Sequence, residues 1–223
     1  MINNFSLEEI LYLRHHLHDA IVRSFSPSST HEPQMIANLV YNLPRLVNNY
    51  QWEGGFKVGA AGIFIHARPF VKSDLFPENK SVELGDLLLL TTVVDSNKNV
   101  VHSRRALLLQ AKKASKLPAS PDNKNQYYLY EKWPEFEYTR SKDLNGKKRR
   151  VIEPDIYDGA KYLLIADKGQ FPFCCNSHHY LFAYDCLSST AKPTRPLSHY
   201  NCFVDELVNF ILGNYGKEVV YPS

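Results

Sequence analysis

Hydrophobic residues recur along the chain at two kinds of spacing, one typical of helices and one typical of strands. Over residues 6–24, Leu and Ile fall at intervals of three and four, which is the pattern of an amphipathic helix. A similar pattern over 34–49 contains Pro44, which we expect to kink or divide that helix. The Ser- and Pro-rich stretch between them, 24–33, is typical of a linker. Helices are therefore predicted over 6–24, 34–49, 125–133 and 203–212.

Short apolar runs without helical spacing predict strands. The run LLLLTTVV follows Asp86 directly, and the polar turn DSNKN (95–99) separates it from the run RALLLQ (105–110). Elements in this order predict an α/β fold in which helices flank a mixed sheet. We expect one domain over 1–223, with an N-terminal helical extension (1–30), a core (31–170) and a C-terminal strand and helix (171–223). Further strands are predicted over 61–67, 161–167 and 179–185.

Composition narrows the class of protein only slightly. The chain has 223 residues, of which 44% are hydrophobic and 22% charged, and these are ordinary proportions for a globular protein. The longest apolar run, 87–94, is far shorter than the ~20 residues of a membrane span. The N-terminus lacks the pattern of a signal peptide, so we expect a cytoplasmic protein with no membrane partner. The net charge of +3 is too small to indicate a nucleic-acid partner by itself.

Three polar residues stand at the ends of the two strands that the turn 95–99 joins. If this turn centres near Lys98, residue 86 lies opposite residue 110, and the alternation of side chains puts Asp86, Gln110 and Lys112 on one face. Carboxylate and amide or carbonyl oxygens suit Mg²⁺, and a lysine can orient a water or stabilise charge on a phosphate. The alternative is that Lys112 only begins a solvated loop, because further lysines follow it.

The segments ELGDLLLL and ALLLQAKK, which carry these residues, resemble the PD-(D/E)xK nuclease superfamily. They look most like the branch in which glutamine replaces the second acid, as in Mrr-like restriction endonucleases and related defence nucleases. The resemblance covers about 31–170, and Gly85 stands where the motif has proline. It implies a restriction-endonuclease-like fold and a DNA endonuclease that depends on Mg²⁺ (or Mn²⁺).

The same resemblance implies partners and a biological setting. The implied partners are DNA and either further copies of the chain or a larger defence complex. The implied setting is bacterial restriction or anti-phage defence. An alternative is a catalytically inactive nuclease-like subunit that binds nucleic acid or serves in assembly, for which the neutral Gln110 leaves room.

Carried over residue by residue, the resemblance assigns roles within the two segments. Asp86 would be a metal ligand, Gln110 would occupy the second ligand position, and Lys112 would be the catalytic lysine. The carbonyl of Ala111 would complete the metal shell. The family often adds a glutamate from the preceding helix, for which Glu32 is the best match. The alternatives for this glutamate are Glu8, Glu9 and Glu83.

Several residues outside these segments are candidates for contacts with DNA or with the site. We expect Lys113 and Gln126 to contact DNA, and Gln126 also lines the site if its helix lies beside it. The basic run 147–150 is either a phosphate contact or a solvated loop. His66 either reaches the site from a neighbouring strand or is a hydrogen-bonded structural histidine. The basic run consists of Lys147, Lys148, Arg149 and Arg150.

Cysteines and histidines gather in the C-terminal segment and raise a separate hypothesis of a zinc site. Cys175 and His178 would form one pair of ligands, and His199 and Cys202 would form the other. Buried cysteines without a metal are the alternative. The remaining members of this group are Cys174, His179 and Cys186.

Overall fold

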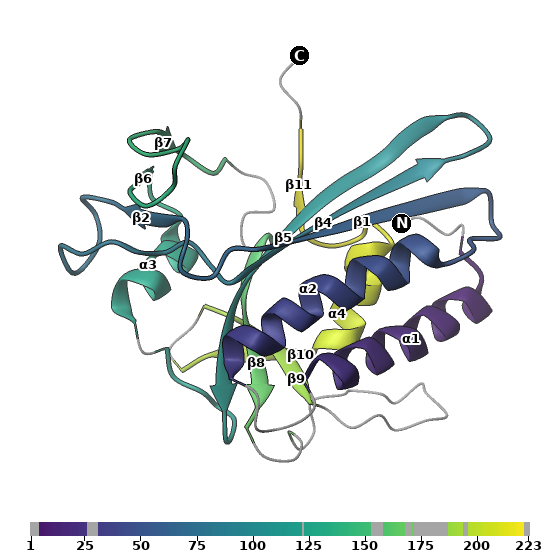
Figure 1. Ribbon diagram of the computed structural model, residues 1–223, viewed down its shortest axis with the longest axis horizontal. Coiled ribbons are helices and arrows are strands. Elements are labelled where there is room, and N and C mark those ends of the chain that lie inside the picture. Colours follow the sequence, from purple (N-terminus) through teal and green to yellow (C-terminus); the bar gives the residue numbers. More distant parts are fainter. Residues whose placement is uncertain are drawn as a thin grey trace.

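A mixed sheet of seven strands lies at the centre of the computed structural model, which describes residues 5–25, 31–121, 123–152, 158–167, 171, 187–193 and 196–220. The strands follow the order β1-β4-β5-β8-β9-β10, and β11 also pairs with β5 (Figure 1). These strands are β1 (Phe56–Phe64), β4 (Leu87–Asp95), β5 (Val100–Ala114), β8 (Ala160–Ala166), β9 (Ser188–Lys192), β10 (Ser198–Cys202) and β11 (Lys217–Glu218).

Helices cover both faces of this sheet. Three of them, α1, α2 and α4, pack together on one face (Figure 1). The fourth, α3, lies against the opposite face, where the ring of Tyr130 is 5.6 Å from that of Tyr162 on β8. The predicted α/β architecture with a mixed sheet between helices is confirmed. The helices are α1 (Leu7–Phe25), α2 (Glu32–Asn49), α3 (Lys124–Lys132) and α4 (Phe203–Ile211).

The strand directions explain the hydrophobic pattern. β1, β4 and β5 are antiparallel neighbours, whereas β8 runs parallel to β5 and is buried along almost its whole length. A parallel strand covered on both faces reads as a continuous apolar run, as YLLIA (162–166) does. The predicted hairpin register is also confirmed, because Leu87 pairs with Leu109 and residue 86 therefore comes level with residue 110.

A second sheet, which the sequence pattern did not predict, has the strand order β3-β2-β6-β7. Its strands have only two or three residues each, which is too short for an alternation of polar and apolar positions to predict them. This sheet and α3 lie together beside one end of the main sheet (Figure 1). The strands are β2 (Phe70–Lys72), β3 (Val82–Glu83), β6 (Phe136–Tyr138) and β7 (Lys148–Arg149).

Other predictions of element boundaries need correction. The strand expected over 61–67 is β1 at 56–64, and α2 continues through Pro44 as one helix instead of being divided. α2 packs on β1, and Pro44 is buried there. A Cβ on Gly62 would lie 3.3 Å from Cγ of Pro44 and 3.2 Å from the carbonyl oxygen of Val40. The strand predicted over 179–185 lies outside the described residues.

Candidate functional site

Asp86 precedes β4 and is held from both sides by backbone hydrogen bonds. Its N–H donates to the carbonyl of Leu109 at 2.9 Å, and its carbonyl accepts from the N–H of Ile65 at 3.0 Å. The residue before it must be small, because a Cβ on Gly85 would lie 2.8 Å from the hydroxyl of Tyr130 and 2.9 Å from a methyl carbon of Leu108. This close approach explains why glycine stands at that position of the motif.

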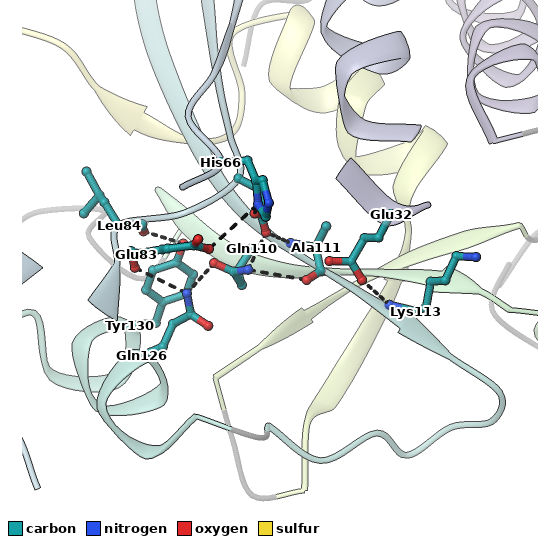
Figure 2. Close-up of polar contacts among 10 residues, drawn as sticks. Glu32, His66, Glu83, Leu84, Gln110, Ala111, Lys113, Gln126 and Tyr130 are labelled. Atoms are coloured by element: carbon teal, nitrogen blue, oxygen red, sulfur yellow. Dashed lines mark hydrogen bonds and ion pairs between the residues drawn. The ribbon is translucent and has the colours of Figure 1, made fainter. Parts of the chain in front are cut away.

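The two carboxylate oxygens of Asp86 face two different neighbourhoods. Oδ2 accepts hydrogen bonds from the backbone N–H of Ala111, at 2.8 Å, and from the side-chain amide of Gln110. Oδ1 lies 2.7 Å from Nδ1 of His66 (Figure 2). Asp86 is only 2% exposed, and a carboxylate buried to this degree needs such partners.

The end of β5 supplies backbone groups that β4 leaves unpaired. β5 continues to Ala114, whereas the ladder with β4 ends at Leu109. Along this edge, the N–H of Ala111 donates to Asp86 and the N–H of Lys113 donates to Oε2 of Glu32, both at 2.8 Å. N–H and C=O groups of every second residue alternate along one edge of a strand, so the carbonyl of Ala111 lies between these two donors. Three oxygen-bearing groups therefore meet on one strand edge (Figure 2).

Glu32 reaches this edge because it is the first residue of α2. Burial raises the pKa of Glu32, and the negative charge of Asp86 acts in the same direction. The hydrogen bond from Lys113 and the positive charges of Lys112 and His66 act to lower that pKa. These interactions put Glu32, Asp86 and Lys112 in one electrostatic neighbourhood, as the sequence predicted.

Glu8 and Glu9, the alternatives to Glu32 that lie in α1, are outside the site, so naming them as alternatives was wrong. Glu9 accepts from the backbone N–H of Ser6 at 2.8 Å, and Ser6 in return accepts from the N–H of Glu9, which is the capping box of α1. Glu9 also accepts from the N–H of Glu53 at 3.0 Å. Glu8 is exposed on the first turn of the same helix.

Gln110 does not present its oxygen to the strand edge. Its amide nitrogen donates to Asp86, while its oxygen accepts from the amide nitrogen of Gln126 on α3 (Figure 2). Gln126 is only 4% exposed and also donates to the carbonyl of Glu83 at 3.3 Å. Gln126 thus lines the site, as one prediction had it, whereas its contact with DNA stays a prediction for a side chain that is buried in this structure. Gln110 positions Asp86, and it would have to turn its amide over to bind a metal.

Lys112 and Lys113 point to opposite faces of β5, because side chains alternate along a strand. Lys112 shares the face of Gln110 and is half-buried, whereas Nζ of Lys113 lies 3.7 Å from Oδ1 of Asp167. The side chain of Lys113 therefore has an acidic neighbour of its own and faces away from Lys112. We do not retain Lys113 among the proposed DNA contacts.

His66 and Glu83 join the site from two short connections. His66 lies in the turn after β1 rather than on a strand, and Glu83 is the last residue of β3. Nδ1 of His66 is 3.9 Å from Oε2 of Glu83 and 2.7 Å from Oδ1 of Asp86. One ligand atom from each of these residues lies within 4.8 Å of the others. Neither strand pattern nor spacing in the sequence pairs His66 with Glu83. From the sequence, Glu83 was an alternative for the additional glutamate and His66 was a residue that could reach the site.

The basic run is not the loop that the sequence suggested. Lys148 and Arg149 form β7, which pairs with β6, and the four basic residues of 147–150 are all exposed. Nζ of Lys148 lies 3.9 Å from Oε1 of Glu135, and both side chains are mostly exposed, so this ion pair contributes little. The run is an exposed positive edge of the sheet that also carries Glu83.

The zinc hypothesis falls mostly outside the described residues. The structure describes the side chain of Cys202, which is buried at the start of α4. The side chains of the other six candidates lie outside the described part of the chain. These are Cys174, Cys175, His178, His179, Cys186 and His199.

The chain matches no family model, no curated protein and no solved structure. Among the described residues, the helices are too short or too polar to cross a membrane. A function must therefore be inferred from the geometry of the site and from the sequence motifs.

Proposed function

We propose that the chain is a Mg²⁺-dependent endonuclease that hydrolyses phosphodiester bonds of DNA, in bacterial restriction or anti-phage defence. The observation that carries this proposal is the edge of β5, where Asp86 and Glu32 hold neighbouring backbone N–H groups on either side of the Ala111 carbonyl. Lys112 lies on the same strand, and its charge acts on Glu32. The biological setting, a cytoplasmic location and assembly with further subunits rest on the family resemblance alone.

The donor set fits a hard cation. Mg²⁺ prefers oxygen ligands and keeps several waters, and the two carboxylates with the Ala111 carbonyl supply oxygens from one strand edge. The oxygen of Gln110 accepts a hydrogen bond from Gln126, so we do not count it among the metal ligands. Bound Mg²⁺ would polarise the phosphate and lower the pKa of an attacking water.

The protein groups supply position and charge. Gln126 fixes the amide of Gln110, which holds Asp86 together with the Ala111 N–H, so the carboxylate keeps one orientation. Lys112 is placed to stabilise the negative charge that grows on the phosphate oxygens during cleavage. The order of helix α2, strands β1, β4 and β5, helix α3 and strand β8 supports a restriction-endonuclease-like core.

The basic edge of the second sheet supports DNA as the substrate. β7 is three strands from β3, which corresponds to about 14 Å at the usual spacing of neighbouring strands. A duplex that presents a phosphate to Lys112 can therefore extend over the exposed run 147–150. We assign to this run contacts with the DNA backbone, which position the substrate without reading its sequence.

Incubation of the chain with supercoiled plasmid and Mg²⁺ or Mn²⁺ tests the proposal. We expect nicked and linear products with either cation and none with EDTA. Asp86→Asn and Glu32→Gln should each abolish cleavage, whereas Asp95→Asn, at the other end of β4, should cleave like the wild type. Equal cleavage by Asp86→Asn and Asp95→Asn would show that the nuclease activity lies elsewhere.

A second candidate function is that of an inactive nuclease-like subunit that binds nucleic acid. The observation that favours it is that both carboxylate oxygens of Asp86 already have hydrogen-bond partners. These partners are His66, Gln110 and Ala111. This candidate predicts DNA binding in EDTA and no cleavage with any divalent cation. Replacement of residues 147–150 by alanine should then weaken binding and reduce its dependence on salt by about one unit of slope per residue. Lys98→Ala, at the tip of the β4–β5 hairpin, serves as the control.

A further inference from the structure

His66, Glu83 and Asp86 form a second cluster of potential ligands, separate from the strand edge that Glu32 shares. They come from the turn after β1, from β3 and from the residue before β4. Their ligand atoms lie within 4.8 Å of one another, on the Oδ1 side of Asp86. Asp86 can therefore contribute Oδ2 to one neighbourhood and Oδ1 to the other.

The charges of this cluster do not balance. Two carboxylates converge on a single imidazole, since Nδ1 of His66 lies 3.9 Å from Glu83 and 2.7 Å from Asp86. Asp86 is almost fully buried, where an uncompensated negative charge is expensive. A dication between the three groups neutralises both carboxylates and uses the imidazole nitrogen as a third ligand.

The cluster is accessible and yet held in place. The side chains of His66 and Glu83 are 33% and 24% exposed, so an ion can enter from solvent. The hydrogen bonds from Gln110 and Ala111 fix Asp86, and Gln126 donates to the backbone carbonyl of Glu83. Surrounding donors of this kind orient metal ligands and raise the affinity of metal sites (Figure 2).

We propose that His66, Glu83 and Asp86 bind a first-row transition-metal dication, such as Mn²⁺ or Co²⁺, in preference to Mg²⁺. An imidazole nitrogen beside two carboxylates suits these ions, whereas Mg²⁺ takes oxygen ligands almost exclusively. This ion lies next to the all-oxygen edge of Asp86, Glu32 and Ala111, with Asp86 between the two. Binding of the ion does not depend on cleavage, and only its effect on the reaction rests on the proposed function.

Titration of the full-length chain with Mn²⁺ tests the site, because the electron paramagnetic resonance signal of free Mn²⁺ counts the bound ions. We expect one tight equivalent that excess Mg²⁺ displaces poorly, and calorimetry should show Co²⁺ binding more tightly than Mn²⁺. His66→Ala and Glu83→Gln should each weaken Mn²⁺ binding by at least about tenfold, since even indirect partners of metal ligands are worth that much. The matched controls His102→Ala and Glu78→Gln, both at exposed positions, should bind like the wild type.

Several results would overturn the site. They are equal affinities of the wild type for Mn²⁺ and Mg²⁺, unchanged Mn²⁺ binding in both site variants, and an equal loss in the controls. Circular dichroism shows whether each variant is folded, and the milder Glu83→Gln replaces His66→Ala if the latter unfolds. A chain that binds Mn²⁺ through His66 but never cleaves DNA would refute the nuclease proposal and leave this site intact. Cleavage with Mg²⁺ by a chain that shows no preference for Mn²⁺ would support the nuclease proposal and refute this site.

Discussion

The main sheet brings a lysine together with carboxylates at two places, and these places are built differently. On the face of α4, Nζ of Lys161 lies 3.1 Å from Oε2 of Glu206, and their side chains are 1% and 2% exposed. The same oxygen accepts from the hydroxyl of Thr190 at 2.5 Å. The ring of Tyr215 lies 4.3 Å from Nζ of Lys161. One cation therefore meets one anion in a closed setting, although Oε1 of Glu206 has no hydrogen-bond partner among the described residues.

At the edge of β5, acids outnumber bases and the setting is open. The charges of Lys112, Asp86 and His66 act on Glu32, and Glu83 and Asp86 both lie beside His66. All of these residues except Asp86 are partly exposed. A sealed and balanced pair helps to specify the fold, whereas an open cluster with excess negative charge costs stability unless a cation joins it. Access and charge balance, rather than the kinds of residue, therefore separate a structural pair from a candidate site.

The same substitution at the two lysines should give opposite results. Lys161→Met leaves the carboxylate of Glu206 buried without its cation, so the free energy of unfolding should fall by about 3–5 kcal/mol. Lys112→Met, on the open side, should change it by less than about 1 kcal/mol and abolish DNA cleavage instead. Urea denaturation of both variants measures the first effect. Equal losses of stability would contradict the view that Lys161 belongs to a structural pair and Lys112 to a functional site.

Gly85→Ala probes how tightly the site is held by α3. The added methyl would lie 2.8 Å from the Tyr130 hydroxyl and 2.9 Å from Leu108, so we expect a loss of about 1–3 kcal/mol in unfolding free energy. Gly59→Ala on β1 is the control, because its Cβ would meet nothing within 4 Å. Thermal unfolding of the pair measures the difference. A Gly85→Ala variant as stable as Gly59→Ala would show that the contact with α3 is loose.

Glu32→Gln should give the smallest effect on stability, and its sign is informative. Burial raises the pKa of Glu32, so between the ordinary and the raised value the folded chain holds more protons than the unfolded chain. In EDTA, the stability of the wild type therefore falls as the pH rises through this window. Because glutamine stays neutral, the variant should be modestly more stable than the wild type at neutral pH, with the difference shrinking in acid.

Added Mg²⁺ should reverse that order, since it stabilises only a chain that binds it. Chemical denaturation at several pH values, with and without Mg²⁺, tests both statements. A variant less stable than the wild type in EDTA at neutral pH would contradict the cost assigned to the ionised carboxylate.

The sequence was sufficient to predict the hairpin that brings Asp86 level with Gln110. Two consecutive strands joined by a short polar turn leave few possible registers, and the turn is fixed by Asp95, which accepts from the N–H groups of Asn97 and Lys98. Glu32 was named only through the family resemblance, and the helix was predicted to begin at residue 34. In the structure α2 begins at Glu32, whose side chain accepts from the N–H of Lys113.

The remaining parts of the site depend on contacts between distant segments. The orientation of the Gln110 amide is set by Gln126, and the burial of Gln126 is set by how α3 packs on the sheet. His66 and Glu83 meet only because β1 is shorter at its end than its apolar run suggests and because β3 belongs to a separate sheet. No periodicity in the sequence contains this information.

Plasmid cleavage by Lys112→Ala and Lys113→Ala, compared side by side in Mg²⁺, is the sharpest test of the proposed phosphodiesterase site. The two variants lose the same charge from adjacent positions of β5, but only Lys112 lies on the face of Asp86 and Gln110. We expect Lys112→Ala to lose at least about 10²-fold in cleavage rate and Lys113→Ala to stay close to the wild type. Equal rates for the two variants, whether both active or both inactive, would contradict a phosphodiesterase site at this strand edge.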